Sequence, residues 1–272
     1  MNKVLCSTGA IIGRPNGRDF TLLEKFRRLI DCDGYEFMMY DTWYDRVDEL
    51  KRFVLSLDIS IPVFHVEKSI GELMGRNFEG DLEKALELFE VNCALANEFG
   101  AEKLVLHLWN GVISDKNIAY NIEGYRYLKG IAEAHALELC VENVVCSEGD
   151  PMSHFKALAK KYSDVKFTFD TKMAAFHNQI QQFCSEENRY VLEKTCHMHI
   201  NDYKGGYKDF NNLKTLHIGK GNIDFQGIFD NLRRVNYRGD FTVEATSFGI
   251  DGEVDHCALN ESIDAVRRYI ST

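Results

Sequence analysis

The chain has 272 residues, of which 45% are hydrophobic and 27% are charged, enough apolar material for one large core. Its 32 basic and 42 acidic side chains give a net charge of −10, and an acidic surface repels nucleic acid phosphates and anionic lipids. We therefore expect neither nucleic acid nor a membrane as a partner. The length suits either one α/β barrel or two small domains.

The cysteines and the N-terminal residues favour a cytoplasmic location. Eight cysteines are scattered without a C-x-x-C pair, which favours reduced thiols in a cytoplasmic protein. The first apolar run is broken by Ser7, Thr8 and Gly9, which is untypical of a secretion signal. No stretch approaches the roughly 18 apolar residues of a membrane-spanning helix.

Eight short runs rich in β-branched and aromatic residues recur along the chain, each followed by a segment with helical periodicity. Between the third and fourth runs, Asp81 is expected to cap a helix that ends at Gly100. An apolar stripe over residues 259–270 predicts a closing helix. The predicted strands are Val4–Thr8, Tyr35–Met39, Pro62–Val66, Lys103–Leu108, Leu139–Asn143, Lys166–Asp170, Cys196–Asn201 and Asp240–Ala245.

These eight strand-then-helix units predict a (β/α)8 TIM barrel that forms a single domain over residues 1–272. Unbroken apolar runs such as Leu104–Leu106 are typical of parallel strands that are covered on both faces. A doubly wound open sheet is the alternative, but no G-x-G-x-x-G follows the first strand. No Gly/Pro/Ser-rich linker divides the chain.

Polar residues end the last four predicted strands, at the side of a barrel where catalytic groups lie. These residues are Glu142, Asp170, His199 and Glu244. Carboxylates gathered in a low-dielectric barrel mouth repel one another unless a cation neutralises them. The four positions therefore predict one divalent metal ion, and the ligand types leave Mn²⁺, Mg²⁺, Co²⁺ and Zn²⁺ open.

The same residues carry a resemblance to a known family. The segments are Val141-Glu142-Asn143, Phe169-Asp170-Thr171, His199-Ile200-Asn201-Asp202, the run from His217 to Asp224, and Val243-Glu244-Ala245. Together they resemble the xylose isomerase-like TIM barrel family, which includes sugar isomerases and epimerases, inosose and dehydroshikimate dehydratases, and endonuclease IV. The resemblance covers nearly the whole chain. It implies a divalent metal held by Glu142, Asp170, His199 and Glu244, and self-association into a homo-oligomer.

Two positions depart from the family pattern. Relatives commonly have a histidine three residues after the aspartate of strand six, where this chain has Met173. Ketose 3-epimerases usually carry an arginine shortly after the strand-seven histidine, where this chain has Tyr203, Lys204 and Gly205. The sequence therefore does not assign ketose 3-epimerase activity.

Other residues near the strand ends are candidates for substrate binding. The resemblance implies that His65 and His107, which end strands three and four, contact substrate hydroxyls or the carbonyl. Glu67 and Glu36 are placed to line the same barrel mouth, although a purely structural role explains them equally well. His197 precedes His199 by two residues, so it faces the same side one layer deeper and is interpreted as a barrel-interior residue.

Three further candidates have a structural alternative. Trp109 is placed either to stack against a sugar ring or to pack in the interior. Asn143 is placed either to orient the substrate or to bond backbone groups. The glycine-rich segment 219–222 with Lys220 has the composition of a phosphate cradle or of a tight turn, and Asp224 competes for its amides. Asp202 is placed to fix a neighbouring group.

The leading functional hypothesis is a metal-dependent isomerase or epimerase of a small sugar, ketose or polyol-derived carbonyl substrate. It would work through an enediolate, with Glu142 and Glu244 as the acid-base pair. A dehydratase of the inosose or dehydroshikimate type on the same metal site is the alternative, because it begins with the same proton abstraction.

Three other classes fit less well. An endonuclease IV-like enzyme requires an electropositive cleft, which an acidic chain does not favour. A Schiff-base aldolase needs a lysine at the catalytic end, whereas Lys103 and Lys166 begin their strands. A further alternative is a binding protein that keeps the pocket in the barrel mouth but catalyses no reaction.

Overall fold

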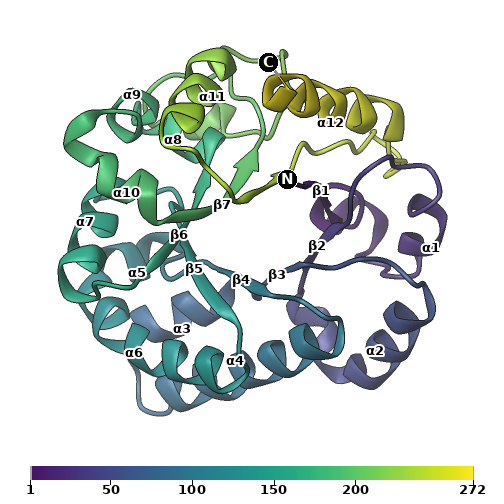
Figure 1. Cartoon of the computed structure of the whole chain (residues 1–272). Coiled ribbons are helices and arrows are strands. Elements are labelled where there is room, and N and C mark those ends of the chain that lie inside the picture. Colours follow the sequence, from purple (N-terminus) through teal and green to yellow (C-terminus); the bar gives the residue numbers. More distant parts are fainter. Residues whose placement is uncertain (1, 272) are drawn as a thin grey trace.

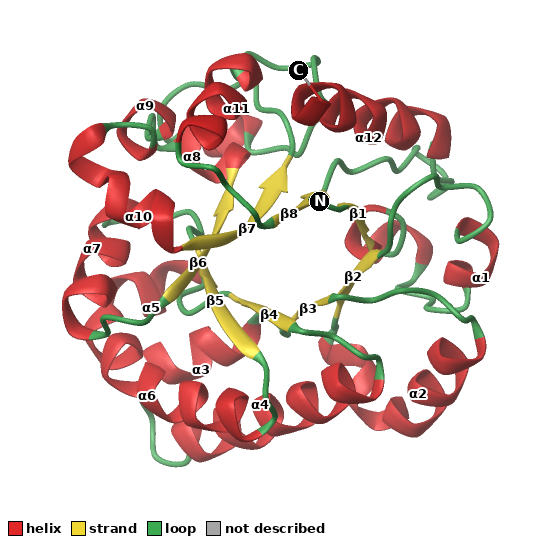
Figure 2. Ribbon diagram, viewed as in Figure 1, coloured by secondary structure: helices red, strands yellow, loops and turns green. Residues whose placement is uncertain are grey.

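The computed structural model describes residues 2–271, and its eight strands close into one parallel barrel in chain order (Figures 1 and 2). Each strand pairs with the next, and β8 pairs with β1 to close the sheet. The predicted (β/α)8 barrel is thus confirmed. The strands are β1 (Val4–Ser7), β2 (Tyr35–Met38), β3 (Val63–His65), β4 (Lys103–Leu106), β5 (Glu138–Glu142), β6 (Lys166–Asp170), β7 (Thr195–Ile200) and β8 (Asp240–Val243).

Helices surround the barrel on its outer side, as Figure 2 shows, because parallel neighbours need a crossover connection. Within residues 2–271, none of these helices combines the length and the apolar character that a bilayer crossing requires. The helices are α1 (Leu22–Phe26), α2 (Val47–Ser56), α3 (Ser69–Arg76), α4 (Asp81–Glu98), α5 (Gly111–Lys116), α6 (Ile118–Ala134), α7 (Pro151–Lys161), α8 (Thr171–Phe176), α9 (Ile180–Phe183), α10 (Arg189–Lys194), α11 (Phe225–Arg234) and α12 (His256–Ser271). Short 3-10 turns lie at Thr8–Ala10, Arg14–Asn16, Asp41–Arg46, Glu186–Asn188 and Phe210–Asn212.

Helix α4 corrects one local prediction and confirms another. Gly80, with a φ of 82°, takes the cap position, and Asp81 is the first helical residue rather than the cap. The Asp81 carboxylate instead accepts hydrogen bonds from the Arg76 guanidinium and from the Phe78 N–H. At the other end, Gly100 adopts a left-handed φ of 75°, which is the predicted helix stop.

The barrel interior is layered. Leu5, Val63 and Val105 form a buried apolar cluster inside the sheet. Side chains alternate along a strand, so the residues two positions further on face the same interior, closer to the carboxyl ends. In β3 and after β4 these residues are His65 and His107. A polar layer therefore lies on an apolar floor, at the end of the barrel where the sequence predicts the site.

The pairing of β6 with β7 contains a register shift that aligns two site residues. Phe167 pairs with Thr195, whereas Thr168 pairs with His197, so β7 carries one extra residue. Such a bulge re-aims the side chains that follow it. As a result Asp170 lies level with His199 across the pair.

Candidate active site at the carboxyl end of the barrel

The structure brings together the four residues that the sequence predicts to converge at the barrel mouth. Glu142 and Asp170 are the last residues of β5 and β6, His199 lies in β7, and Glu244 directly follows β8. One ligand atom from each lies within 4.8 Å of the others. The first three side chains are fully buried, and Glu244 is partly exposed. The convergence follows from the strand register, and the ligand roles stay a prediction.

His199 is the centre of this arrangement, because carboxylates contact both of its ring nitrogens. Nδ1 lies 2.9 Å from Oε1 of Glu142, 3.5 Å from Oε2 of Glu244 and 4.0 Å from Oδ2 of Asp170. Nε2 lies 3.0 Å from Oε1 of Glu36 on the opposite side. A neutral Nδ1 lone pair directed at three carboxylates is unfavourable, so this nitrogen needs either a proton or a cation beside it.

The pKa shifts reflect this crowding of charge. Burial alone would lower the pKa of His199, but Glu244, Glu36 and Glu142 hold it well above its ordinary value. Burial would raise the pKa of Glu142, and the nearby His199 and His107 instead hold it well below its ordinary range. Burial raises the pKa of Asp170, with Glu142 and Glu244 adding to the effect. Without a metal, one imidazolium therefore faces several carboxylates, and the site keeps an excess of negative charge.

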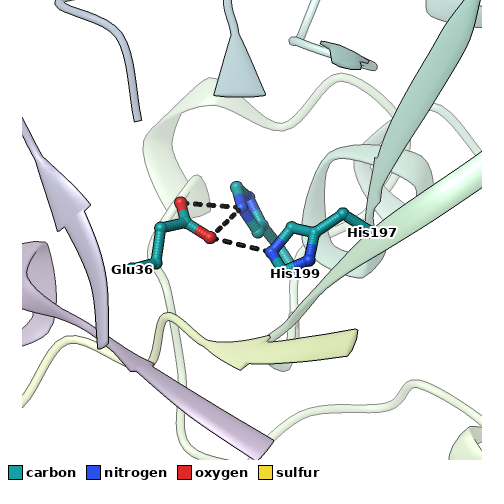
Figure 3. A group of neighbouring side chains, drawn as sticks. All are labelled: Glu36, His197 and His199. Carbon is teal, nitrogen blue, oxygen red and sulfur yellow. Dashed lines mark hydrogen bonds and ion pairs between the residues drawn. The ribbon is translucent and has the colours of Figure 1, made fainter. Parts of the chain in front are cut away.

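Glu36 of β2 has a clearer position than the sequence indicates. Its carboxylate faces the imidazole rings of both β7 histidines, as Figure 3 shows, with Oε2 2.8 Å from Nε2 of His197. His197 also contacts Oγ1 of Thr242 at 3.0 Å. Burial would raise the pKa of Glu36, but His199 and His197 hold it well below its ordinary value. Glu36 thus fixes the ring of His199 and leaves Nδ1 directed at the other carboxylates.

Asp170 is held by a network of neutral donors. Its Oδ1 accepts the Met173 N–H at 2.6 Å, which caps helix α8, and its Oδ2 accepts Nδ2 of Asn201 at 2.8 Å. Asn143 bonds both the N–H and the carbonyl of Asp170. These contacts favour a positioning role for Asn143, and its contact with substrate stays a prediction. The methionine that departs from the family pattern supports Asp170 through its backbone.

His65 and His107 lie where the sequence places them, beside Glu142. Nε2 of His107 lies 2.7 Å, and Nε2 of His65 3.5 Å, from Oε2 of Glu142. Nδ1 of His65 also bonds the Val66 carbonyl at 2.9 Å. Burial lowers the pKa of His107 to about 4, despite the nearby carboxylate of Glu142. His107 is therefore neutral at pH 7.

Trp109 and Glu67 have structural partners that the sequence does not reveal. Trp109 is fully buried, donates its indole N–H to the Val144 carbonyl at 2.8 Å and packs edge-on against His154, which favours the packing interpretation over an open sugar wall. Glu67 accepts hydrogen bonds from the N–H and the hydroxyl of Ser69 at the start of α3. These contacts do not support the predicted substrate-binding roles of Trp109 and Glu67.

The amides of the glycine-rich segment are already bonded, which favours the tight-turn alternative over a phosphate cradle. Oδ2 of Asp202 accepts the N–H groups of Gly219 and Gly221, and its Oδ1 accepts that of Ile223. The amides of Lys220 and Asn222 bond backbone carbonyls. Every amide from residue 219 to 223 thus already has an acceptor. Asp202 occupies the place of an anion, and the Lys220 side chain stays exposed beside it.

The residues present fit a divalent cation. Within the part of the chain that the structure describes, Oε1 of Glu244 is buried without a hydrogen-bond partner, whereas Oε2 of Glu142 lies 2.7 Å from Nε2 of His107. Buried carboxylate oxygens are costly unless they are paired or bind a metal. The donor set of three carboxylates and one imidazole nitrogen matches the preferences of Mn²⁺, Mg²⁺, Co²⁺ and Zn²⁺.

Solved structures share this fold over their whole length. A D-tagatose 3-epimerase-like protein is 19% identical with a TM-score of 0.72, and the match covers 99% of this chain and 97% of that chain. L-ribulose 3-epimerase is 16% identical with a TM-score of 0.75, covering 100% and 95%. The IOLI protein, solved with a bound zinc atom, is 14% identical with a TM-score of 0.70, covering 99% and 98%. At these identities the likeness shows the fold.

The sequence comparisons give the family. No curated protein matches the chain. The family model described as xylose isomerase-like TIM barrel matches residues 26–269. Since this match spans most of the chain and the structure has the corresponding closed barrel, the protein belongs to the xylose isomerase-like TIM barrel family.

Proposed function

We propose that this protein is a divalent-metal-dependent isomerase or epimerase of a small sugar-like carbonyl compound. The observation that carries the proposal is the convergence of Glu142, Asp170, His199 and Glu244 within 4.8 Å at the catalytic end of the barrel. The structures of L-ribulose 3-epimerase, of a D-tagatose 3-epimerase-like protein and of the zinc-containing IOLI protein have the same fold and support it.

The metal would be held by Glu142, Asp170, Nδ1 of His199 and Glu244. A bound divalent cation supplies Lewis acidity, which makes a C–H bond beside a carbonyl easier to ionise. Asp170 is suited to a purely positioning role, because its two oxygens are already fixed by Met173 N–H and Asn201. The nature of the ion stays open among Mn²⁺, Mg²⁺, Co²⁺ and Zn²⁺.

Glu142 and Glu244 are the proposed acid-base pair. Glu142 ends β5 and Glu244 directly follows β8, and Oε1 of Glu244 is buried without a hydrogen-bond partner among the described residues. Glu142 is ionised at neutral pH, since its pKa lies well below its ordinary range against the effect of burial, through His199 and His107. One carboxylate removes the proton beside the carbonyl, and the other returns a proton to the opposite face or to the neighbouring carbon.

The substrate is proposed to be neutral and rich in hydroxyl groups. His107, with a pKa lowered by burial to about 4, offers a neutral imidazole beside Glu142. His65 lies next to it, with the two ring centres 4.9 Å apart. The segment 219–223 has no free amide for a phosphate, because Asp202 and backbone carbonyls accept all of them. An unphosphorylated polyol carbonyl therefore fits best.

Solvent isotope exchange tests the proposal. The metal-loaded protein is incubated in D₂O with a panel of ketoses and inososes, and NMR follows both deuterium entry and the appearance of an isomer or epimer. Glu142→Gln and Glu244→Gln should each lower the rate by about 10²–10⁴-fold, the usual contribution of a general acid or base, without loss of the fold. Asp81→Asn is the matched control, because this buried carboxylate bonds Arg76 instead of His199.

The same assay separates the alternatives. Full activity in either glutamine variant contradicts the acid-base assignment. Loss of a β-hydroxyl, seen as a conjugated product that absorbs in the ultraviolet, would assign the site to a dehydratase instead. Metal binding without turnover of any compound in the panel would favour a binding protein.

A further inference from the structure

A second group of potential ligands lies outside the candidate active site. Asp115 is in α5, His154 is in α7, and Cys146 is in the loop between β5 and α7. All three are buried, and one ligand atom from each lies within 4.8 Å of the other two. Figure 1 shows α5 and α7 on the same side of the barrel. Two connections at the catalytic end, the one after β4 that contains α5 and the one after β5 that leads into α7, thus meet around one point.

The geometry of this cluster differs from that of a Cys-His-Asp catalytic triad. A triad uses the two nitrogens of the imidazole for two different partners. Here Nε2 of His154 faces both groups, 3.9 Å from Sγ of Cys146 and 3.4 Å from Oδ1 of Asp115. Three atoms that converge from different directions on the same point are typical of ligands to one ion.

The distances between these atoms fit tetrahedral zinc. With Zn–S of about 2.3 Å and Zn–N and Zn–O of about 2.0–2.1 Å, tetrahedral angles separate sulfur from nitrogen by roughly 3.6 Å and nitrogen from oxygen by roughly 3.4 Å. The observed 3.9 Å and 3.4 Å need only a small inward movement of Cys146. A water molecule would complete the four-coordinate shell.

Two independent features point to a ligand at this place. Oδ1 of Asp115 is buried without a hydrogen-bond partner among residues 2–271, whereas Oδ2 accepts the Glu148 N–H at 2.7 Å. Gly149 leaves room beside the cluster, because a Cβ there would lie 3.0 Å from both Oδ1 of Asp115 and Nε2 of His154. The missing side chain and the unpaired oxygen face the same spot.

We propose that Asp115, Cys146 and His154 bind a zinc ion that links α5, α7 and the loop after β5. Binding converts the Cys146 thiol to a thiolate and releases its proton to solvent. The thiolate and the Asp115 carboxylate then balance the two positive charges of the ion, so the buried group is neutral overall. Thiolate, imidazole and carboxylate are the usual ligands of zinc.

The electrostatics of the metal-free cluster agree with this chemistry. Burial, followed by the charge of Asp115, raises the pKa of the Cys146 thiol. Burial lowers the pKa of His154, so the imidazole is neutral and its Nε2 lone pair is available. A divalent cation reverses the first effect, because it stabilises the thiolate directly.

The position of Cys146 suggests a structural role. Cys146 follows Glu142 by four residues, and its backbone N–H bonds Nε2 of His177 at 3.0 Å. A zinc ion here would anchor the loop that leaves the candidate acid-base residue. The two sites are chemically distinct, since the active-site group contains no sulfur ligand.

Cobalt substitution tests the proposal without any enzyme assay. Co²⁺ bound to a thiolate gives an intense charge-transfer band in the near ultraviolet, and Co²⁺ bound to carboxylates and imidazole does not. The full chain, titrated with Co²⁺, should develop this band with the intensity of one cobalt–thiolate site per chain, and Zn²⁺ should abolish it. Cys146→Ser should remove the band, whereas Glu142→Gln should retain it.

Cys140→Ser is the matched thiol control. Sγ of Cys140 lies 2.7 Å from Sγ of Cys196, in another sulfur-containing group that includes Glu138. Retention of the band in Cys140→Ser together with its loss in Cys146→Ser supports the proposal. Absence of a band in the wild-type chain at saturating Co²⁺, or its persistence in Cys146→Ser, overturns it.

Two further variants keep the test decisive if Cys146→Ser fails to fold. Asp115→Asn retains an oxygen for the Glu148 N–H but removes the charge, and Gly149→Ala places a methyl group against the ligand atoms. Gly149 does not have a left-handed φ, so alanine introduces no backbone strain of that kind. Both should weaken Zn²⁺ binding by about tenfold or more in a chelator competition. Unchanged affinity in both variants overturns the proposal.

Discussion

Glu36→Gln probes how the second strand of the barrel controls the metal ligand on the seventh. In the structure the Glu36 carboxylate lies 3.0 Å from Nε2 of His199 and 2.8 Å from Nε2 of His197, and all three side chains are fully buried. Glutamine keeps the size of the side chain but removes its charge and directs an amide N–H₂ toward two imidazoles. His199 then loses its charged partner on Nε2.

The expected magnitude follows from that single contact. A buried hydrogen bond to a charged group contributes about 1.5–3 kcal/mol. At about 1.4 kcal/mol per factor of ten, this corresponds to roughly 10–100-fold in metal affinity, which is also the usual effect of removing a carboxylate behind a histidine ligand. We therefore expect Glu36→Gln to bind Mn²⁺ more weakly by one to two powers of ten, with the fold retained.

Electron paramagnetic resonance measures this effect directly, because free aqueous Mn²⁺ gives a strong signal that is lost on binding. Mn²⁺ prefers oxygen ligands, so the titration reports on the carboxylate site rather than on Cys146. Glu67→Gln serves as the control, since it neutralises a buried carboxylate that bonds Ser69. Wild-type affinity in Glu36→Gln, or an equal loss in Glu67→Gln, refutes the positioning role of Glu36.

Two further predictions concern stability. His107 has a folded-state pKa lowered by burial to about 4, so the unfolded chain takes up its proton first; the free energy of unfolding should fall by up to about 3 kcal/mol between pH 6.5 and pH 4. Urea denaturation across this range should show a shallower loss in His107→Asn, and parallel curves would contradict the assignment. Asp202→Asn turns a buried acceptor of the Gly219 and Gly221 amides into a donor, which should cost about 2–4 kcal/mol in the same assay. A loss below about 0.5 kcal/mol, the range of ordinary surface substitutions, would show that these bonds do not stabilise the loop.

The strands and the four carboxyl-end residues could be predicted from the sequence because both follow from local pattern. Short apolar runs define the strands, and the last polar residue of a parallel strand must face the barrel mouth. Glu142, Asp170 and His199 satisfy this rule, and Glu244 directly follows β8. Their convergence then requires only that the barrel closes.

Contacts across the barrel could not be predicted in this way. Glu36 lies in β2 and reaches residues 161 and 163 positions later in β7, a contact that exists only in the closed sheet. Asp202 accepts three amides of the segment 219–223 from 17 to 21 residues earlier in the chain. A glycine-rich sequence alone cannot show that these amides are already used.

The second cluster illustrates the same limit. Asp115, Cys146 and His154 are separated by 31 and 8 residues and follow no metal-binding spacing. Their meeting depends on where α5 and α7 pack against the barrel. Trp109 shows that the sequence can also suggest a contact that the structure does not support. An aromatic residue beside a strand end is compatible with stacking on a sugar ring, but the indole N–H of Trp109 bonds the Val144 carbonyl.

The central claim is that four side chains hold one divalent ion at the carboxyl end of the barrel. A crystal soaked in Mn²⁺ and measured at the manganese absorption edge tests it most directly. The account predicts one strong anomalous peak about 2.0–2.3 Å from carboxylate oxygens of Glu142, Asp170 and Glu244 and from Nδ1 of His199. A peak that lacks any two of these ligands, or no peak in the barrel mouth at saturating Mn²⁺, would contradict it.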